Sequence, residues 1–297
     1  MSKQTIFITG ATTGIGRHAA LHLAARGHHV IASGRKDDLL VEIKAEAERA
    51  GGRLDTVKLD VTDAASIAAA VVEAQRLTSG RGIDALVNNA GYGQPGPLEE
   101  VSDEELRRQF ETNVFGLMAV TRAFLPQLKG RRGRLVNLSS IGGRVTFPLF
   151  GAYHASKYAV EALSDALRNE LAPFGVRVAL VEPGPIRTEF GDRAIAAVHA
   201  LARPGSAYSS VYARADEIKA LTAKQEVGPE VVSRAIEHAL TARRPRLRYV
   251  VPFTSRLLVA LMRALPQRWV DALVQRLAGL TPRALGLNGR PLLETAR

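Results

Sequence analysis

The feature that most constrains the fold is a glycine turn between a strand and a helix near the start of the chain. Gln4 to Thr9 (QTIFIT) is rich in β-branched and aromatic residues and predicts a buried strand. The turn Gly10 to Gly16 (GATTGIG) follows, and Arg17 to Arg26 continues as a predicted helix. Glycines let the backbone approach a phosphate, and a helix N-terminus offers free N–H groups. This order predicts an α/β fold with a dinucleotide site at its first turn.

The second predicted strand, His28 to Ser33, ends without the carboxylate that would bind a ribose 2′-hydroxyl. It is followed by Gly34, Arg35 and Lys36, with Arg17 in the preceding glycine turn. A guanidinium binds a 2′-phosphate in bidentate fashion, whereas a carboxylate repels it. The pattern favours NADP(H). The alternative is that Arg35 is an ordinary surface arginine after a strand.

Strands and helices alternate along the rest of the chain. Asp60 and Val61 follow the third strand, where they are expected to cap the adenine edge of a dinucleotide site. Ser102 opens a long helix with a capping box that includes Glu105. Asn113 lies inside that helix, where asparagine is unfavourable, so a specific role is expected for it. The alternative is that Asn113 is simply exposed. The remaining predicted strands are 54–59, 83–87, 135–138, 176–181 and 248–251, and the remaining predicted helices are 38–50, 64–78, 153–171 and 229–243.

A second group of polar residues follows the predicted strand 135–138. Ser140 comes where that strand ends, and Tyr153 and Lys157 lie one turn apart on the helix 153–171. A phenol is a poor base at neutral pH, but a nearby ammonium lowers its pKa. Tyr153 can then exchange a proton with a carbonyl or alcohol oxygen that Ser140 holds. The alternative is that this tyrosine–lysine spacing marks only a solvated helix face.

Composition excludes several classes of protein. The chain has no cysteine, which excludes disulfides and thiolate metal sites. His18 and His22 lack a third ligand nearby, so no metal site is expected. The net charge is +11, yet residues 243–297 hold eleven arginines and two acids and carry +9 of it. This distribution argues against a nucleic-acid-binding core. Without a signal peptide or an apolar run of 18 residues, a cytoplasmic protein is expected.

Taken together, these residues resemble the short-chain dehydrogenase/reductase family over about residues 3–251. TGATTGIG resembles the family's T-G-x-x-x-G-x-G cofactor loop, and NNAG at 88–91 its stabilising motif after the fourth strand. PGPIRT at 183–188 resembles its P-G-x-x-x-T segment. The residues that match the family's catalytic four, by motif and order, are Asn113, Ser140, Tyr153 and Lys157.

This resemblance implies a Rossmann fold, a doubly wound parallel sheet of about seven strands with helices on both faces. It implies that Tyr153 is the general acid/base, that Lys157 lowers its pKa and holds the nicotinamide ribose, and that Ser140 orients the carbonyl oxygen. Asn113 would support a water-mediated proton path to Lys157, and Thr188 would contact the nicotinamide amide. The residues expected to bind the cofactor are Gly10, Thr12, Thr13, Gly14, Ile15, Gly16, Arg17, Arg35, Asp60, Val61, Asn89, Ala90, Gly91, Tyr153, Lys157, Pro183, Gly184, Ile186 and Thr188.

The resemblance is nearest to dehydrogenases of hydroxysteroids, retinol and related lipophilic substrates, and it implies a homo-oligomer, dimer or tetramer. The small-molecule substrate would be a carbonyl or alcohol, selected by 145–150 and by a helical cover over 189–228. One alternative is a 3-oxoacyl thioester reductase whose basic tail meets an acidic carrier protein. Another is a regulator that senses NADP(H) without turnover.

Two parts are expected: a catalytic domain over 1–251 and a basic helical extension over 252–297. Residues 253–280 predict two short amphipathic helices broken before Pro266. With Trp269 among its apolar residues, this pattern is typical of a peripheral membrane contact. The alternative, which we favour from the sequence, is that the apolar side packs over the substrate pocket or a second subunit. That side comprises Leu257, Leu258, Leu261, Leu265, Trp269, Leu273 and Leu277, and the flanking charges are Arg256, Arg263, Arg268 and Arg276.

Overall fold

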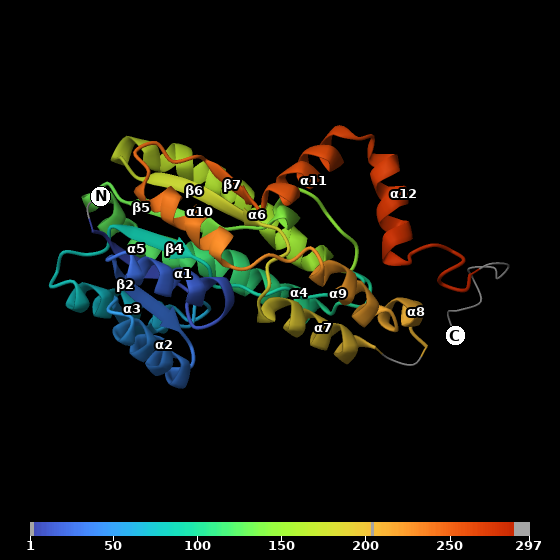
Figure 1. Cartoon of the computed structure of the whole chain (residues 1–297), viewed down its shortest axis with the longest axis horizontal. Helices are drawn as coiled ribbons and strands as arrows, with labels where there is room; N and C mark the ends of the chain where they lie inside the picture. Colours follow the sequence, from blue (N-terminus) through green and yellow to red (C-terminus); the bar gives the residue numbers. More distant parts are fainter. Residues whose placement is uncertain (1–2, 203–204, 288–297) are drawn as a thin grey trace.

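The computed structural model describes residues 3–202 and 205–287 and contains one parallel sheet of seven strands (Figure 1). The strand order is β3-β2-β1-β4-β5-β6-β7, so the chain reverses direction across the sheet between β1 and β4. All seven predicted strands are present, with ends displaced by two residues at most. The strands are β1 (Thr5–Ile8), β2 (His29–Gly34), β3 (Arg53–Lys58), β4 (Ala85–Asn88), β5 (Arg134–Leu138), β6 (Arg177–Pro183) and β7 (Arg248–Val251).

Helices cover both faces of this sheet, because alternate residues of each strand point to opposite sides. In β1, Ile6 and Ile8 enter one core with α1 (Gly14–Ala25), α2 (Asp37–Arg49) and α10 (Glu230–Thr241). Phe7 enters the other core with α3 (Ala64–Leu77), α5 (Leu117–Arg131) and α6 (Gly151–Leu171). The predicted doubly wound fold is confirmed.

The helix predicted to open at Ser102 is present but has three parts. Its first part, α4 (Asp103–Phe110), begins with the expected capping box between Ser102 and Glu105. A π-helical turn, Glu111–Gly116, then joins it to α5. Such turns are frequently found at functional sites. This turn carries Asn113.

The predicted cover between 189 and 228 is helical, as expected. It consists of α7 (Glu189–Leu201), α8 (Ser209–Tyr212) and α9 (Ala215–Ala223). Short 3-10 turns also occur at Ile141–Gly143 and Ala172–Phe174.

The C-terminal extension forms α11 (Phe253–Ala264) and α12 (Gln267–Ala278), broken before Pro266 as predicted. Both helices project from one end of the molecule (Figure 1). The prediction that their apolar side packs over the pocket is wrong within this chain: six of its seven residues are exposed, and Leu265 is half-buried. Only Ser255, Val259 and Val270 of these helices are buried.

Residues 288–297 of the predicted extension lie outside the described residues, and the division at 251/252 stays a prediction. Among the residues that the structure describes, no helix is long and apolar enough to cross a membrane.

Candidate active site

The turn between β1 and α1 is a cradle in which three glycines, Gly10, Gly14 and Gly16, leave the backbone open. Gly10 and Gly14 have φ values of +61° and +54°, which favour glycine. A Cβ on Gly16 would lie 2.3 Å from Gly10 O and from Asn89 Nδ2, so no side chain fits there. Thr13 is the N-cap of α1 but gives it no side-chain hydrogen bond, and its first turn has no acid. Free N–H groups at a helix N-terminus suit a pyrophosphate. Thr12 and Ile15 belong to the same turn.

The NNAG segment after β4 holds this turn in place. Asn89 Nδ2 donates to the carbonyls of Thr9 and Gly10, at 3.0 and 2.9 Å. The Thr9 hydroxyl in turn accepts from the backbone N–H groups of Asn89 and Ala90. A Cβ on Gly10 would lie 2.8 Å from Ala90 Cα, and one on Gly91 would lie 3.0 Å from Asn113 Oδ1. The segment therefore packs against both the cofactor turn and the π-helical turn.

The two arginines predicted to hold a 2′-phosphate differ in their surroundings. Arg35, at the end of β2, is 76% exposed, and its only ion pair among the described residues is a 3.9 Å contact with Asp60. Arg17 instead points to α2, where its guanidinium contacts the carboxylates of Glu42 and Glu46. A phosphate would have to compete with these two carboxylates for Arg17. Arg35 is therefore the available partner.

Asp60 and Val61 lie after β3, at the carboxyl edge of the sheet. Although burial opposes the shift, hydrogen bonds from the Thr62 backbone and hydroxyl lower the pKa of Asp60. Val61 is buried, and a Cβ on Gly116 would lie 2.7 Å from its carbonyl oxygen. The close approach of Gly116 fixes this end of the cofactor site against the π-helical turn.

Ser140, Tyr153 and Lys157 come together as predicted. Tyr153 and Lys157 are in the first turns of α6, and Lys157 Nζ lies 5.8 Å from the Tyr153 ring centre. The ammonium donates to the carbonyl of Leu138, the last residue of β5, at 2.8 Å. Ser140 follows β5, and its hydroxyl is hydrogen-bonded to Tyr153. The same hydroxyl accepts from Gly142 N at 3.0 Å and donates to Pro183 O at 3.3 Å.

The pKa of Tyr153 is raised, whereas the sequence predicted that it would be lowered. Burial raises the pKa of Tyr153 to about 12, although the hydrogen bond with Ser140 acts against this. The ammonium of Lys157, which donates to the Leu138 carbonyl, does not offset that rise. Burial also lowers the pKa of Lys157 to about 8. At pH 7 the pair is therefore a neutral phenol beside a cation, so Tyr153 carries the proton that reduction of a carbonyl requires.

Asn113 has a positioning contact that the sequence did not reveal. Its Nδ2 donates to Tyr92 O at 2.9 Å and to Ser156 Oγ at 3.1 Å, and its Oδ1 accepts from Tyr92 N at 3.1 Å. The side chain thus ties the loop after NNAG to α6, beside Lys157. Gln109 supports the same loop by donating to Tyr92 O at 2.8 Å. The water-mediated path from Asn113 to Lys157 stays a prediction.

The segment predicted to meet the nicotinamide borders this site. Pro183 ends β6, and a Cβ on Gly184 would lie 1.9 Å from Ser255 Oγ of α11. Ile186 is buried and pairs with Val227 in an isolated bridge. Thr188 is the N-cap of α7, and a Cβ on Gly14 would lie 3.6 Å from Thr188 Cβ. The segment 183–188 therefore links the cofactor cradle to the helical cover and the extension.

Aromatic rings beside Tyr153 form a wall that the motifs did not predict. The ring centres of His154 and Phe190 lie 5.7 and 5.6 Å from that of Tyr153. His154 also contacts Phe147 and Phe150, within the segment expected to select the substrate. Burial lowers the pKa of His154 to about 4, so this imidazole is uncharged at neutral pH. The polar group at Tyr153 therefore lies against an apolar surface.

Known proteins of one family are similar to this chain over most of its length. The family model described as short chain dehydrogenase matches residues 4–198. Oxidoreductase YbbO of Escherichia coli (strain K12) is 36% identical over 275 residues, covering 92% of this chain and 94% of that protein. An NADPH-dependent 3-dehydrocapnine reductase of Ornithobacterium rhinotracheale is 35% identical, covering 89% and 93%. Retinol dehydrogenase 16 of Homo sapiens is 37% identical, covering 91% and 87%.

Solved structures share the fold. A short-chain dehydrogenase/reductase from Burkholderia phymatum, in complex with NAD, superposes with a TM-score of 0.77 at 26% identity, covering 88% of this chain and 93% of that one. A variant of actinorhodin polyketide ketoreductase with NADPH gives a TM-score of 0.72 at 28% identity, covering 84% and 95%. These two structures hold different nicotinamide cofactors, so likeness alone does not choose between NAD and NADP.

Proposed function

Because this chain belongs to the short-chain dehydrogenase/reductase family, we propose that it reduces a lipophilic carbonyl compound, or oxidises the corresponding alcohol, with NADP(H). The observation that carries this proposal is the group of Ser140, Tyr153 and Lys157 beside a glycine cradle with an aromatic wall. The cradle suits a dinucleotide, because its glycines let a pyrophosphate approach the backbone and the uncapped start of α1 offers N–H donors.

The cofactor, when bound, supplies or accepts the hydride. Tyr153 donates its phenolic proton to the carbonyl oxygen, and in the reverse direction it accepts the alcohol proton. Ser140 holds that oxygen by rotating its hydroxyl from the long 3.3 Å bond with Pro183 O. When the cofactor is bound, Lys157 would hold the nicotinamide ribose, and its positive charge would favour the phenolate that forms when the proton leaves. Asn113 keeps the loop at Tyr92 against α6, so the helix that carries Tyr153 and Lys157 stays in place.

The preference for NADP(H) is supported by the end of β2. Arg35 is exposed and available, and Lys36 beside it is the N-cap of α2. Gly34 packs on Thr12, since a Cβ on Gly34 would lie 2.5 Å from Thr12 Cγ2. The end of β2 is therefore in contact with the glycine turn. Two of the similar proteins also carry NADPH in their names. Together these features favour a 2′-phosphate beside Arg35.

A lipophilic substrate is supported by the aromatic wall and by α11. Val259 and the partly buried Met262 of α11 pack against Ile141, Val145 and Phe147. The extension therefore contacts the segment expected to select the substrate. A steroid, retinoid or fatty aldehyde fits an apolar wall better than a sugar does. A 3-oxoacyl thioester is the second candidate, because the basic extension suits an acidic carrier.

The test is the oxidation of NADPH followed with a panel of steroids, retinoids, fatty aldehydes, sugars and acyl thioesters. We expect turnover with at least one apolar ketone or aldehyde, and none by the Tyr153→Phe variant. Turnover confined to acyl thioesters would favour the second candidate. Tight NADPH binding without turnover of any carbonyl would favour the cofactor-sensing regulator.

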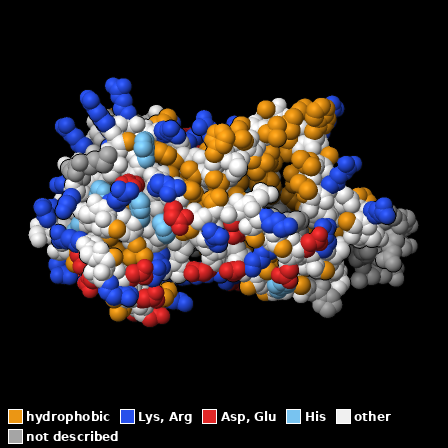
Figure 2. Space-filling view, viewed as in Figure 1, with side chains coloured by type: hydrophobic (Ala, Val, Ile, Leu, Met, Phe, Trp, Pro, Cys, Tyr) orange, Lys and Arg blue, Asp and Glu red, His pale blue; other side chains and the backbone are white. Residues whose placement is uncertain are grey.

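We also propose that α11 and α12 contact the surface of an anionic membrane. Figure 2 shows hydrophobic side chains gathered over α11. Trp269 is 58% and Leu277 69% exposed, and four exposed arginines alternate with these apolar residues. A basic, apolar helix with an interfacial tryptophan matches a membrane surface in both charge and polarity. The exposed large apolar residues are Phe253, Leu257, Leu258, Leu261, Trp269, Leu273 and Leu277.

Co-sedimentation with vesicles of phosphatidylcholine and phosphatidylserine tests this contact. The full chain should pellet with them at low salt and be released by salt, while Trp269→Asp and Leu273→Asp should weaken pelleting. Val72→Asp, at a 66% exposed position on α3, is the matched control and should pellet normally. No pelleting of the full chain would refute the membrane contact.

The homo-oligomer that the family resemblance implies, a dimer or tetramer, is a separate proposal. Sedimentation equilibrium of the full chain without lipid tests it. If Trp269→Asp and Leu273→Asp dissociate that oligomer, the exposed face of α11 and α12 is its subunit contact.

A further inference from the structure

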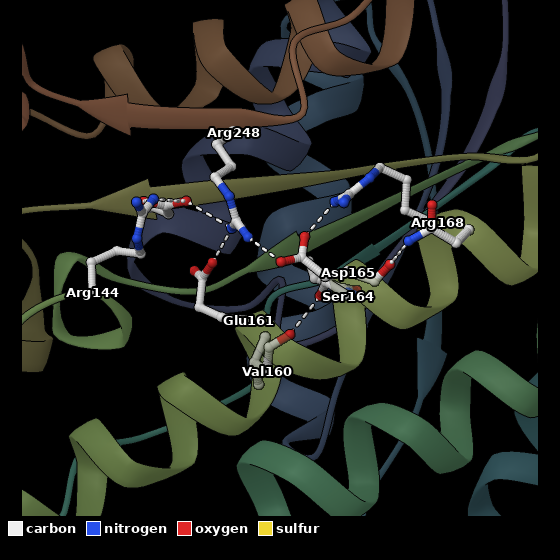
Figure 3. Close-up of polar contacts among 10 residues, drawn as sticks. Arg144, Val160, Glu161, Ser164, Asp165, Arg168 and Arg248 are labelled. Carbon is white, nitrogen blue, oxygen red and sulfur yellow. Dashed lines mark hydrogen bonds and ion pairs between the residues drawn. The ribbon is translucent and has the colours of Figure 1, made fainter.

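A partly buried cluster of charges begins on α6 one turn after Lys157, at residues to which the family motifs assign nothing. Figure 3 shows Arg248 at its centre. The cluster joins α6 to β6, to β7 and to the residue that follows the 3-10 turn after β5. Its six members comprise three carboxylates and three guanidinium groups. They are Glu161, Asp165, Arg168, Glu182, Arg144 and Arg248.

Arg248 is the centre of this cluster. Its Nη1 contacts a carboxylate oxygen of Glu161 and lies 3.3 Å from Glu182 Oε1, while its Nη2 lies 2.6 Å from Asp165 Oδ2. Arg144 Nη1 donates to both carboxylate oxygens of Glu182, at 3.1 and 3.3 Å. One guanidinium on β7 therefore connects the helix of Tyr153 and Lys157 with the strand that leads to the segment 183–188.

Stability alone does not explain such a cluster. Buried ion pairs are often no more stable than apolar residues of similar volume, because both charges lose their hydration. Glu182 is fully buried, and Glu161 is nearly so. Burial and the neighbouring charge of Glu182 raise the pKa of Glu161 to about 7, although Ser139, Arg248 and Arg144 act against this. An apolar residue at position 161 would avoid that cost, so we sought a role for the carboxylate.

The carboxylate is placed to act on Lys157. Glu161 lies one helical turn after Lys157, on the same face of α6. Its negative charge raises the pKa of Lys157, against the larger lowering by burial. Gly143 closes the wall on this pair, since a Cβ there would lie 2.9 Å from Glu161 Cγ and 3.0 Å from Lys157 O. Gly143 therefore packs directly against both residues of this pair.

We propose that Glu161 is a positioning residue that keeps the Lys157 ammonium charged, with Arg248 holding its carboxylate in place. The groups that face Glu161 are Lys157 and Asp165 from α6, Glu182 from β6, Arg248 from β7, and Arg144 and Ser139 from the segment after β5. Of these, Lys157 alone belongs to the proposed catalytic group. The inference rests on the proposed function, because a charged Lys157 serves only an enzyme that uses Tyr153.

The direct test measures the protonation of Lys157 without turnover. The chain has eight lysines, so ¹³Cε-labelled lysine gives few NMR signals, and Lys157→Arg identifies the one from Lys157. In Glu161→Gln, which keeps the shape but removes the charge, the titration midpoint of Lys157 should fall by about one pH unit. Glu161→Asp keeps the charge and should restore most of this change.

Asp165→Asn is the matched control. It removes another carboxylate from Arg248 but lies two turns from Lys157, so the Lys157 midpoint should stay within about 0.3 of wild type. If Glu161→Gln does not fold, Arg248→Gln tests the same step, because it releases the Glu161 carboxylate from its partner and should also lower the midpoint. An unchanged midpoint in the folded variant would overturn the inference.

A second measurement separates this inference from the proposed function. The alkaline fall in the rate of NADPH oxidation with decanal should move to lower pH in Glu161→Gln, by the same amount as the NMR midpoint. If the NMR midpoint moves but wild type oxidises no NADPH with any carbonyl, the inference stands and the proposed function fails. If neither the midpoint nor the rate profile moves, Glu161 has only a structural role and the inference fails.

Discussion

The cofactor cradle and the cluster of charges around Arg248, called the charged wall below, are built in opposite ways. The cradle is formed by backbone: Gly10, Gly14 and Gly16 remove side chains, and α1 leaves its first N–H groups free. The charged wall consists of partly and fully buried charges, held between α6, β6 and β7 by Arg248. A cofactor that brings its own negative charge needs space and donors, whereas a lysine that must stay charged in a buried place needs a counter-charge.

The largest effect should come from substitution of Tyr153. Tyr153→Phe removes only the phenolic hydroxyl, so turnover should fall by a factor of about 10² to 10⁴ while NADPH binding stays nearly intact. Rates of NADPH oxidation and a fluorescence titration of NADPH measure the two quantities separately. Activity within about tenfold of wild type would refute the assignment of Tyr153 as acid/base.

One added methyl group at Gly16 should disrupt the cofactor cradle. Gly16→Ala places a Cβ against Gly10 O and Asn89 Nδ2, so the turn must open and NADPH affinity should fall at least about tenfold. Gly130→Ala is the matched control, because a Cβ there meets nothing within 4 Å and alanine favours its helix, α5. Unchanged NADPH affinity in Gly16→Ala would show that the cradle tolerates side chains.

Most of the cradle could be predicted from the sequence, whereas little of the charged wall could. The strands are predictable because their apolar runs are local, and the glycine turn is predictable because its residues are contiguous. Arg248 contacts Glu161 and Asp165, which lie 87 and 83 residues away, and no local pattern signals such pairs. The partners of Asn113 are likewise 21 and 43 residues away. The exposure of the apolar side of α11 and α12 depends on tertiary packing, so periodicity alone could not decide it.

The next effect concerns which cofactor enters the cradle. A charge-assisted contact with phosphate contributes roughly 1.5–3 kcal/mol, so Arg35→Asp should shift the preference for NADPH over NADH about ten- to a hundredfold. Arg53→Asp, an exposed position at the start of β3, changes the net charge equally and should leave the preference unchanged. If wild type uses NADH as well as NADPH, Arg35 does not select the cofactor.

The smallest effect is the pH dependence of carbonyl reduction at saturating NADPH, and it reports on the charged wall. Tyr153, with its pKa near 12, stays protonated throughout, so the alkaline fall belongs to Lys157. Because burial lowers the pKa of Lys157 to about 8, the ammonium loses its proton, and the rate falls, as pH rises through that value. Glu161, whose pKa burial raises to about 7, is charged in the pH range where Lys157 titrates, so it supports the ammonium there. Below pH 7 Glu161 becomes neutral, but Lys157 is then protonated without it. The rate should therefore be level below about pH 7 and severalfold lower about one pH unit above 8. Initial rates with decanal check this, and Glu161→Gln should move the fall to lower pH; a rate that climbs steadily to about pH 10 would mean that the phenolate, and not the lysine cation, limits the reaction.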